Sequence, residues 1–162
     1  NPLCLQCPIS FDCKALLLSK QTDFPIKIKK KPKPHYNIAV GIIWDNNHLL
    51  ITKREDKGLL GGLWEFPGGK MNSNESPKQA VKREINEELS IKVRAEEVIH
   101  KIDHHYTHFS VTINAVKCFY KGGDIHLNGP TNYKWIKVQN LKDFAFPKGS
   151  IKLFNAIKDV QC

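Results

Sequence analysis

The chain has 162 residues, which suffices for one ordinary globular domain and a short additional segment but not for two full domains. Hydrophobic residues make up 41% and charged residues 25%, near the averages for globular proteins, which excludes collagen-like and wholly disordered chains. The longest nearly uninterrupted apolar stretch, Ile38 to Trp44, is about a third of what a membrane helix needs. We therefore expect no membrane span.

Three of the five cysteines lie within the first 13 residues, at Cys4, Cys7 and Cys13, with the spacing C-x2-C-x5-C. Thiolates this close in sequence can converge on zinc or on an iron-sulfur cluster, but structural sites of both kinds normally use four protein ligands. Free thiols or a disulfide stay open as alternatives. Because the chain begins with Asn beside this cluster, we expect it to be part of a longer protein whose fourth ligand lies upstream of residue 1.

The next segment is basic and rich in proline. Residues 20–33 carry six lysines against one acid, a net +5 of the chain's +9, and three prolines between 21 and 34 favour an extended connector. We predict a short helix within 9–18, a first segment over 1–19 and a linker over 20–35. Such a run is typical either of a solvated linker or of contacts to a polyanion. The lysines that would contact a DNA backbone are Lys27, Lys29, Lys30, Lys31 and Lys33.

Residues 36–162 have the pattern of a single domain that contains both strands and helices. Strands are predicted at 37–44 and 48–54 around a turn at 45–47, and further strands at 91–95, 98–103, 106–120 and 133–138. A helix is predicted from Pro77 to about Leu89, because Ser76 and Gln79 have the spacing of a capping box and Pro77 takes the first helical position. A second helix is predicted over 150–160. The fold class is α+β, with a mixed sheet covered by helices.

Glu84, Glu87 and Glu88 lie on one face of the predicted helix, where like charges at helical spacing repel. A hard divalent cation such as Mg2+ would compensate this repulsion, since it takes oxygen ligands and commonly bridges carboxylates to phosphates. Arg83, four residues before Glu87, would orient one carboxylate. The alternative is a solvated acidic face.

The spacing around this helix resembles the Nudix box, G-x5-E-x7-R-E-U-x-E-E-x-G-U. The matching residues are Gly69-x5-Glu75-x7-Arg83-Glu84-Ile85-x-Glu87-Glu88-x-Ser90-Ile91, and only Ser90 departs from the pattern, where the family has glycine. The resemblance implies the Nudix fold, an αβα sandwich with a mixed β-sheet. It also implies that in an active member Glu84, Glu87 and Glu88 would bind the metal that helps water to attack a diphosphate, and that Arg83 would belong to the same catalytic set. A serine at position 90 would strain a left-handed helix C-cap.

A second resemblance is narrower. The run GGLWEFPGG at 61–69 is similar to the Nudix-like C-terminal domain of the MutY adenine DNA glycosylases, and the cysteine spacing is similar to the last three ligands of that family's four-iron four-sulfur cluster. The family's lesion-reading Phe-Ser-His motif corresponds to Tyr106-Thr107-His108, which the resemblance implies would contact 8-oxoguanine. The Thr107 hydroxyl could accept a hydrogen bond from the N7-H that distinguishes 8-oxoguanine from guanine.

The main hypothesis is therefore that the chain is the lesion-recognition domain of an adenine DNA glycosylase in base excision repair, binding double-stranded DNA with 8-oxoguanine opposite adenine. Because the glycosylase core is absent, we expect no base excision by this chain, and a complete four-iron four-sulfur cluster only in the parent protein. The alternative is a Mg2+-dependent Nudix pyrophosphohydrolase acting on oxidised nucleoside triphosphates. We further expect a cytoplasmic, DNA-associated monomer.

Overall fold

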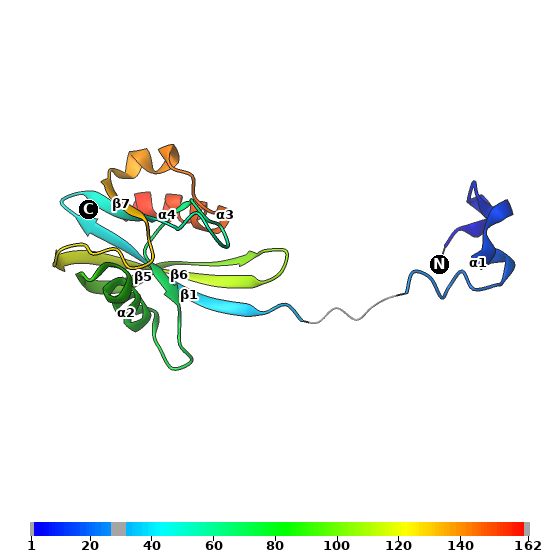
Figure 1. The fold of residues 1–162 in the computed structure, drawn as a ribbon, viewed down its shortest axis with the longest axis horizontal. Helices are drawn as coiled ribbons and strands as arrows, with labels where there is room; N and C mark the ends of the chain where they lie inside the picture. The colour runs from blue at the N-terminus through cyan, green and yellow to red at the C-terminus, as the bar shows by residue number, and fades with distance from the viewer. Residues whose placement is uncertain (1, 27–31, 161–162) are drawn as a thin grey trace. The chain divides into compact units, whose positions relative to one another are not determined.

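The structure is a computed structural model that describes residues 2–26 and 32–160. The chain divides into two compact units, residues 1–32 (unit 1) and 33–162 (unit 2) (Figure 1). No helix in the described ranges is long and apolar enough to cross a membrane.

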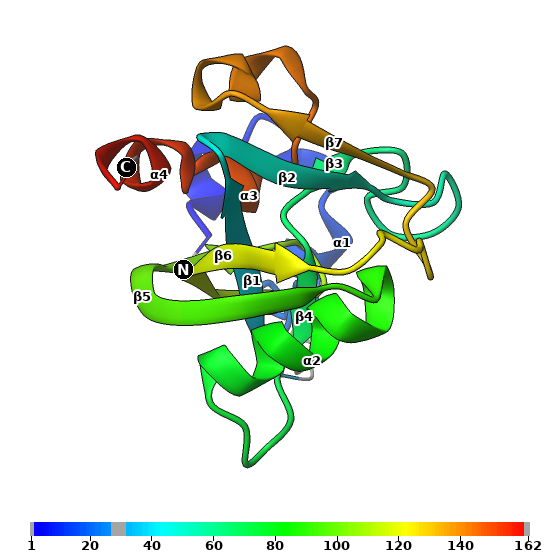
Figure 2. The ribbon, with the colours of Figure 1, turned by 90° about the vertical axis from the view of Figure 1, so that its left-hand side faces the viewer.

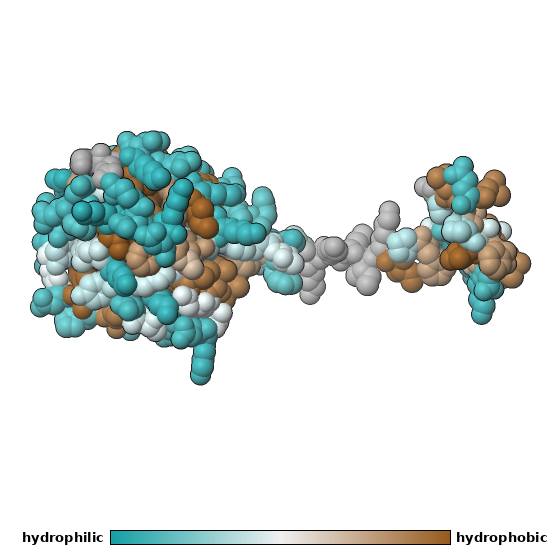
Figure 3. Space-filling view, turned by 90° about the horizontal axis from the view of Figure 1, so that it is seen from above, coloured by the Kyte–Doolittle hydropathy of each residue, from teal (hydrophilic) through white to brown (hydrophobic). Residues whose placement is uncertain are grey.

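Unit 1 contains only short helical turns: η1 (Cys4–Gln6), η2 (Ser10–Asp12) and α1 (Lys14–Leu17). None of residues 2–26 is buried, and apolar side chains such as Leu5 and Phe11 are exposed, as the brown patches of this unit in Figure 3 show. The helix predicted within 9–18 is therefore one 3-10 turn and one α-helical turn. A longer helix would need an apolar surface to pack against, because a short isolated helix is marginal in water.

Unit 2 is built on a mixed sheet of seven strands in the order β3-β2-β1-β6-β5, with β4 paired to β1 and β7 paired to β2. Strands β1 and β6 are parallel, and the other pairs are antiparallel. The elements are β1 (His35–Asp45), β2 (His48–Lys53), β3 (Trp64–Glu65), β4 (Gly68–Lys70), α2 (Pro77–Leu89), β5 (Lys92–His105), β6 (Ser110–Gly122), β7 (Asn132–Ile136), η3 (Val138–Asp143), α3 (Lys148–Ile151) and α4 (Phe154–Asp159).

Helices cover both faces of this sheet, with α2 on one face and η3, α3 and α4 on the other (Figure 2). The apolar residues of β1 alternate between the two cores: Ala39 and Ile43 pack with α2, whereas Ile42 packs with Leu153 and Ile157. Because both faces are covered, the middle of β1 is a nearly continuous apolar run. The predicted α+β class, an αβα sandwich with a mixed sheet, is confirmed.

Helix α2 begins and ends as its sequence predicts. The backbone N-H of Gln79 donates to the Ser76 hydroxyl at 3.4 Å, and the backbone N-H of Ser76 donates to the Gln79 side chain at 2.9 Å, so both halves of the capping box form. The helix ends at Ser90, whose φ of +58° is the left-handed conformation that favours glycine. The family's glycine is therefore replaced at a position where the backbone conformation matters.

Three predicted elements differ from the structure. The strands at 91–95 and 98–103 form one strand, β5, because bulges absorb the break in alternation. Strand β6 begins only at Ser110, because residues 106–109 form the preceding hairpin turn, in which the Tyr106 N-H donates to the Phe109 carbonyl at 2.8 Å. The C-terminal helix is split into α3 and α4, where the Leu153 N-H donates to the carbonyl of Ser150 at 3.0 Å in a tighter turn.

Candidate functional site

Arg83 orients three of the carboxylates associated with α2. Its Nε and Nη2 donate to the two oxygens of Glu75, at 2.8 Å each, and its Nη1 donates to Glu84 at 2.9 Å and to Glu87 at 3.1 Å. The hydrogen bonds from Arg83, followed by that from the Asn72 N-H, lower the pKa of Glu75 to about 2, and Glu75 in turn raises the pKa of Arg83. The predicted contact between Arg83 and Glu87 is thus present, and Arg83 also fixes Glu84.

Glu88 lies outside this Arg83 network, half-buried against β4. Its carboxylate accepts a long hydrogen bond of 3.4 Å from the Gly68 N-H. Burial raises its pKa to about 7, and the charges of Glu65 and Glu84 add to the effect. A Cβ at Gly69 would lie 2.5 Å from the Glu84 carboxylate, so this glycine leaves the room that Glu84 occupies.

The glutamates of α2 are suitable ligands for Mg2+ in their chemistry, although their side chains do not converge on one point. Within residues 2–26 and 32–160, no three His, Cys, Asp or Glu side chains are arranged as the ligands of a metal ion. Glu84 and Glu87 are held by Arg83, and Glu88 faces Gly68. All three supply hard oxygen donors. Burial is the main cause of the raised pKa of Glu88, and the neighbouring negative charges that add to it are ones a cation would relieve. Glu84, Glu87 and Glu88 are thus the residues that would hold the ion.

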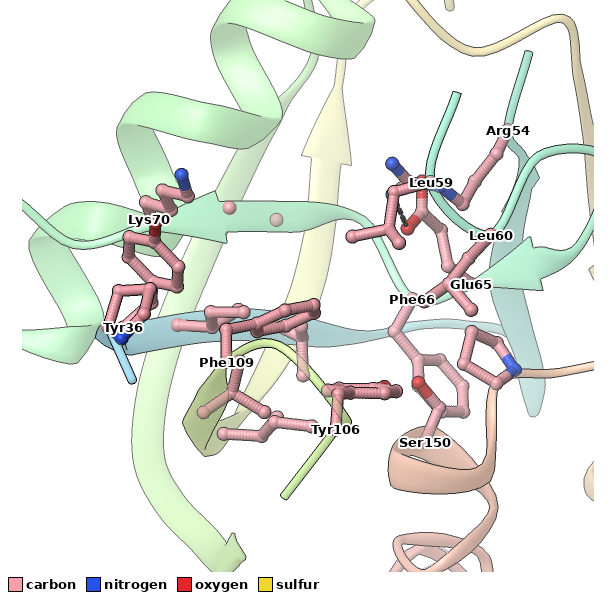
Figure 4. A pocket seen from close by; sticks show the side chains of 18 of the residues that line it. Tyr36, Arg54, Leu59, Leu60, Glu65, Phe66, Lys70, Tyr106, Phe109 and Ser150 are labelled. Atoms are coloured by element: carbon pink, nitrogen blue, oxygen red, sulfur yellow. Dashed lines mark hydrogen bonds and ion pairs between the residues drawn. The ribbon is translucent and has the colours of Figure 1, made fainter. Parts of the chain in front are cut away.

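A cavity of about 620 Å3 extends from Glu88 along the sheet (Figure 4). At one end it is lined by Glu88 and by the Arg54–Glu65 ion pair, whose partners are 2.5 Å apart. Burial raises the pKa of Glu65, against the opposing influence of Arg54. This end is therefore charged and close to the candidate metal ligands.

The rest of the cavity has an aromatic wall formed by Tyr36, Tyr106 and Phe109 (Figure 4). The ring of Tyr106 stacks on that of Phe109, with centroids 4.6 Å apart and an interplanar angle of 26°. The Nζ of Lys70 lies 4.0 Å from the centroid of Tyr36. Flat aromatic surfaces of this kind suit a planar heterocycle such as a nucleobase.

The residues assigned to lesion binding separate in the structure. Tyr106 and His108 line the cavity, and burial raises the pKa of Tyr106. Thr107, at the exposed tip of the β5–β6 hairpin, is not among the lining residues. The sequence analysis missed Tyr36 and Phe109, which come from strand and turn segments far apart in the chain. Glu65 lies within the GGLWEFPGG run, which drew attention to this segment, but the sequence assigned no role to Glu65 itself.

The cysteines of unit 1 do not form a metal site in the structure. Cys4, Cys7 and Cys13 are free and partly exposed, and the described residues contain no metal-binding group. Cys4 and Cys7 lie in one helical turn, in which the Cys7 N-H donates to the Cys4 carbonyl, and Cys13 ends the next turn, where its N-H donates to the carbonyl of Ser10. The four-iron four-sulfur cluster expected in a parent protein, with its fourth ligand upstream of residue 1, has no support from the described residues.

The basic linker is only partly described. Lys27, Lys29, Lys30 and Lys31 lie outside the described residues, and Lys33 is exposed at the start of unit 2. Contacts of these lysines with duplex DNA stay a prediction, as does the monomeric state.

Comparisons with known proteins agree with the fold and the motif. A family profile described as NUDIX domain matches residues 39–156. The chain is 35% identical to the 8-oxo-dGTP diphosphatase of Buchnera aphidicola over 111 residues, 68% of this chain and 84% of that protein. It is 39% identical to the 8-oxo-dGTP diphosphatase of Proteus vulgaris over 83 residues, 51% of this chain and 74% of that protein. A crystal structure of a MutT protein from Methanosarcina mazei shares the fold, with a TM-score of 0.72 over 80% of this chain and 97% of that chain at 22% identity.

These relatives overturn the main hypothesis from the sequence. The chain is also 34% identical to the adenine DNA glycosylase of Arabidopsis thaliana over 86 residues, but these are 44% of this chain and only 14% of that protein. The relatives matched over most of their length are 8-oxo-dGTP diphosphatases, so the assignment to an adenine DNA glycosylase in base excision repair is wrong. The GGLWEFPGG run misled us because it lies within the residues that match the NUDIX domain profile, so it does not require a glycosylase core. On the profile match and the shared fold, this chain belongs to the Nudix family.

Proposed function

We propose that the chain is a Mg2+-dependent Nudix pyrophosphohydrolase that acts on an oxidised purine nucleoside triphosphate such as 8-oxo-dGTP. The observation that carries this proposal is a cavity that joins an aromatic wall to the Glu88 carboxylate of the Nudix helix. A base stacked on Tyr106 and Phe109 would direct its phosphates toward Glu88. The named activity of the Buchnera and Proteus relatives supports the same substrate.

Each part of the site has a separate task in this proposal. Glu84, Glu87 and Glu88 would hold Mg2+, which when bound neutralises phosphate charge and favours attack by water. Arg83 keeps Glu84 and Glu87 oriented through hydrogen bonds from one guanidinium nitrogen. The aromatic wall of the larger cavity would shield the base of the substrate from water. A cytoplasmic location, where nucleoside triphosphates are made, belongs to this proposal as well.

The narrower resemblance to MutY glycosylases does not require that this chain act in base excision repair. We propose that the partial match to an adenine DNA glycosylase reflects a Nudix domain common to both proteins, which accounts for its coverage of 14% of that relative.

Turnover of 8-oxo-dGTP and of dGTP with Mg2+ tests the proposal, with products separated by chromatography. We expect turnover of about 1 per second or faster, the lower range of typical enzymes, and loss of activity in Glu87→Gln and Glu88→Gln. Glu97→Gln, at an exposed glutamate of β5, is the matched control and should keep full activity. No turnover with either Mg2+ or Mn2+, or turnover that survives both substitutions in α2, would refute the proposal.

A further inference from the structure

A second, smaller cavity lies on the other side of the Glu88 carboxylate. It has a volume of about 280 Å3 and shares Arg54, Glu65 and Glu88 with the larger cavity. Its remaining lining residues are Glu55, Lys57, Gly129 and Pro130. The candidate metal ligand Glu88 and the Arg54–Glu65 ion pair therefore border both spaces.

The floor of this smaller cavity is fixed between α2 and β2. The Asn128 N-H donates to the carbonyl of Glu88 at 2.8 Å, and the Asn128 side-chain amide donates to the carbonyl of Glu87 at 3.1 Å. On the other side, the Thr131 N-H donates to the carbonyl of Lys53 at 2.9 Å. Gly129 and Pro130 lie between these anchors, so the floor is held by the same helix that carries the glutamates.

The mouth of the cavity is formed by the loop between β2 and β3. Two hydrogen bonds close the base of this loop, from the Arg54 N-H to the carbonyl of Leu63 and from the Gly62 N-H to the carbonyl of Glu55, at 3.0 Å each. A Cβ at Gly61 would lie 2.3 Å from the Asp56 carbonyl oxygen, so the loop needs glycine at this position. The backbone around Lys57 is thereby held in place, while its side chain is exposed.

The charges around this cavity leave one cation available to a ligand. Three carboxylates, those of Glu55, Glu65 and Glu88, face two cations, and Arg54 is already paired with Glu65. Lys57 forms no ion pair with any residue that the structure describes. A divalent cation on the α2 glutamates would offset their charge, so that an anion held between the ion and Lys57 becomes favourable.

We propose that Lys57 binds the terminal phosphate of the substrate and makes the site prefer nucleoside triphosphates over diphosphates. This inference rests on the proposed function, which places the base in the larger cavity and its phosphates at Glu88. The smaller cavity is lined by both Glu88 and Lys57. In this placement the first two phosphates lie at the Glu88 carboxylate, and a third phosphate would extend into the smaller cavity beside the lysine. Lysine suits this task as a compact charge on a flexible stem.

Binding of the α,β-methylene analogues of 8-oxo-dGTP and 8-oxo-dGDP, measured by calorimetry with Mg2+, tests the inference without requiring turnover. Lys57→Ala should weaken binding of the triphosphate analogue roughly tenfold, as for loss of one charged phosphate contact, and should leave the diphosphate analogue unchanged. Lys57→Arg should restore most of the preference. Lys78→Ala, at an exposed lysine in the first turn of α2, is the control and should change neither affinity.

The outcomes separate this inference from the proposed function. If Lys57→Ala weakens both analogues equally or neither of them, the inference is wrong even when the wild-type protein hydrolyses 8-oxo-dGTP. If the wild-type protein shows the lysine-dependent preference but no turnover, the hydrolase proposal fails and phosphate recognition by Lys57 stands. Binding of neither analogue would refute both. Unchanged thermal unfolding of the Lys57 variants would show that the loop is intact.

Discussion

Replacing Glu88 by glutamine should stabilise the metal-free protein at pH 8 much more than at pH 5. Burial, with the charges of Glu65 and Glu84, raises the pKa of Glu88 from 4.5 to about 7. Between these values the folded protein keeps a proton that the unfolded chain has lost, so the stability contributed by this group is present below pH 4.5 and is lost as the pH rises through 7. The two pKa values correspond to about 3 kcal/mol, of which roughly 2.5 kcal/mol is lost between pH 5 and pH 8. Glutamine carries no charge and escapes this loss.

Urea denaturation in the presence of EDTA, at pH 5 and pH 8, gives the free energies of unfolding. The stability gained by Glu88→Gln over the wild type should be about 2 kcal/mol larger at pH 8 than at pH 5. Glu97→Gln should show almost no such difference, because its carboxylate is exposed. A pH-dependent gain below about 0.5 kcal/mol, the usual error of additivity, would mean that burial and the neighbouring charges do not raise the pKa of Glu88 to about 7. Mg2+ should stabilise the wild type at pH 8 more than the variant, since it binds the folded state.

Three further predictions concern the backbone and the thiols. Ser90→Gly should raise the free energy of unfolding by about 0.5 to 1 kcal/mol in urea, because φ is +58° there; an unchanged or lower midpoint would contradict this. Gly68→Ala should lower the free energy of unfolding by at least about 2 kcal/mol, since the new Cβ would lie 2.2 Å from the Ala39 carbonyl oxygen. Gly58→Ala should lower it less, because Gly58 has a φ of +100° but open space around it. Equal losses in the two variants would show that steric contact does not determine the effect. Burial raises the pKa of the Cys118 thiol to about 12. Iodoacetamide at pH 8 should therefore label the three cysteines of unit 1 and leave Cys118 unmodified until urea is added. Detection of labelled Cys118 in the native protein by mass spectrometry would refute this.

The parts of the fold that depend on neighbouring residues were predictable from the sequence. Helix α2 is an example, because the capping box at Ser76 and the apolar spacing of Val81, Ile85 and Leu89 are local signals. The contacts of Arg83 with Glu87 follow from the same helical spacing. The break between α3 and α4 depends on a tight turn at Leu153, which carries no glycine or proline to mark it.

The cavities could not be predicted in this way, because they are assembled from distant segments. Tyr36 reaches Phe109 only through the pairing of β1 with β6. Lys57 and Glu88 line the same cavity although one belongs to the β2–β3 loop and the other to α2. The motif could not decide between a glycosylase domain and a nucleotide hydrolase either. The glutamates of a Nudix box indicate phosphate chemistry, but they do not indicate which protein contains the domain. The match over most of the length of 8-oxo-dGTP diphosphatases overturned the glycosylase hypothesis, which the motif alone could not do.

The parallel pair at the centre of the sheet has a consequence for folding kinetics. Strand β1 pairs with β6 from His35 opposite Ser110 to Trp44 opposite Phe119, so each contact joins residues 75 positions apart. Closing a loop of this length costs entropy before the contacts repay it, which slows folding relative to domains dominated by local contacts. During synthesis, β1 can pair with β2 and β4 early, but it stays without its parallel neighbour until Phe119 has left the ribosome. For that interval the apolar middle of β1 presents an open edge, and the chain is most exposed to aggregation then.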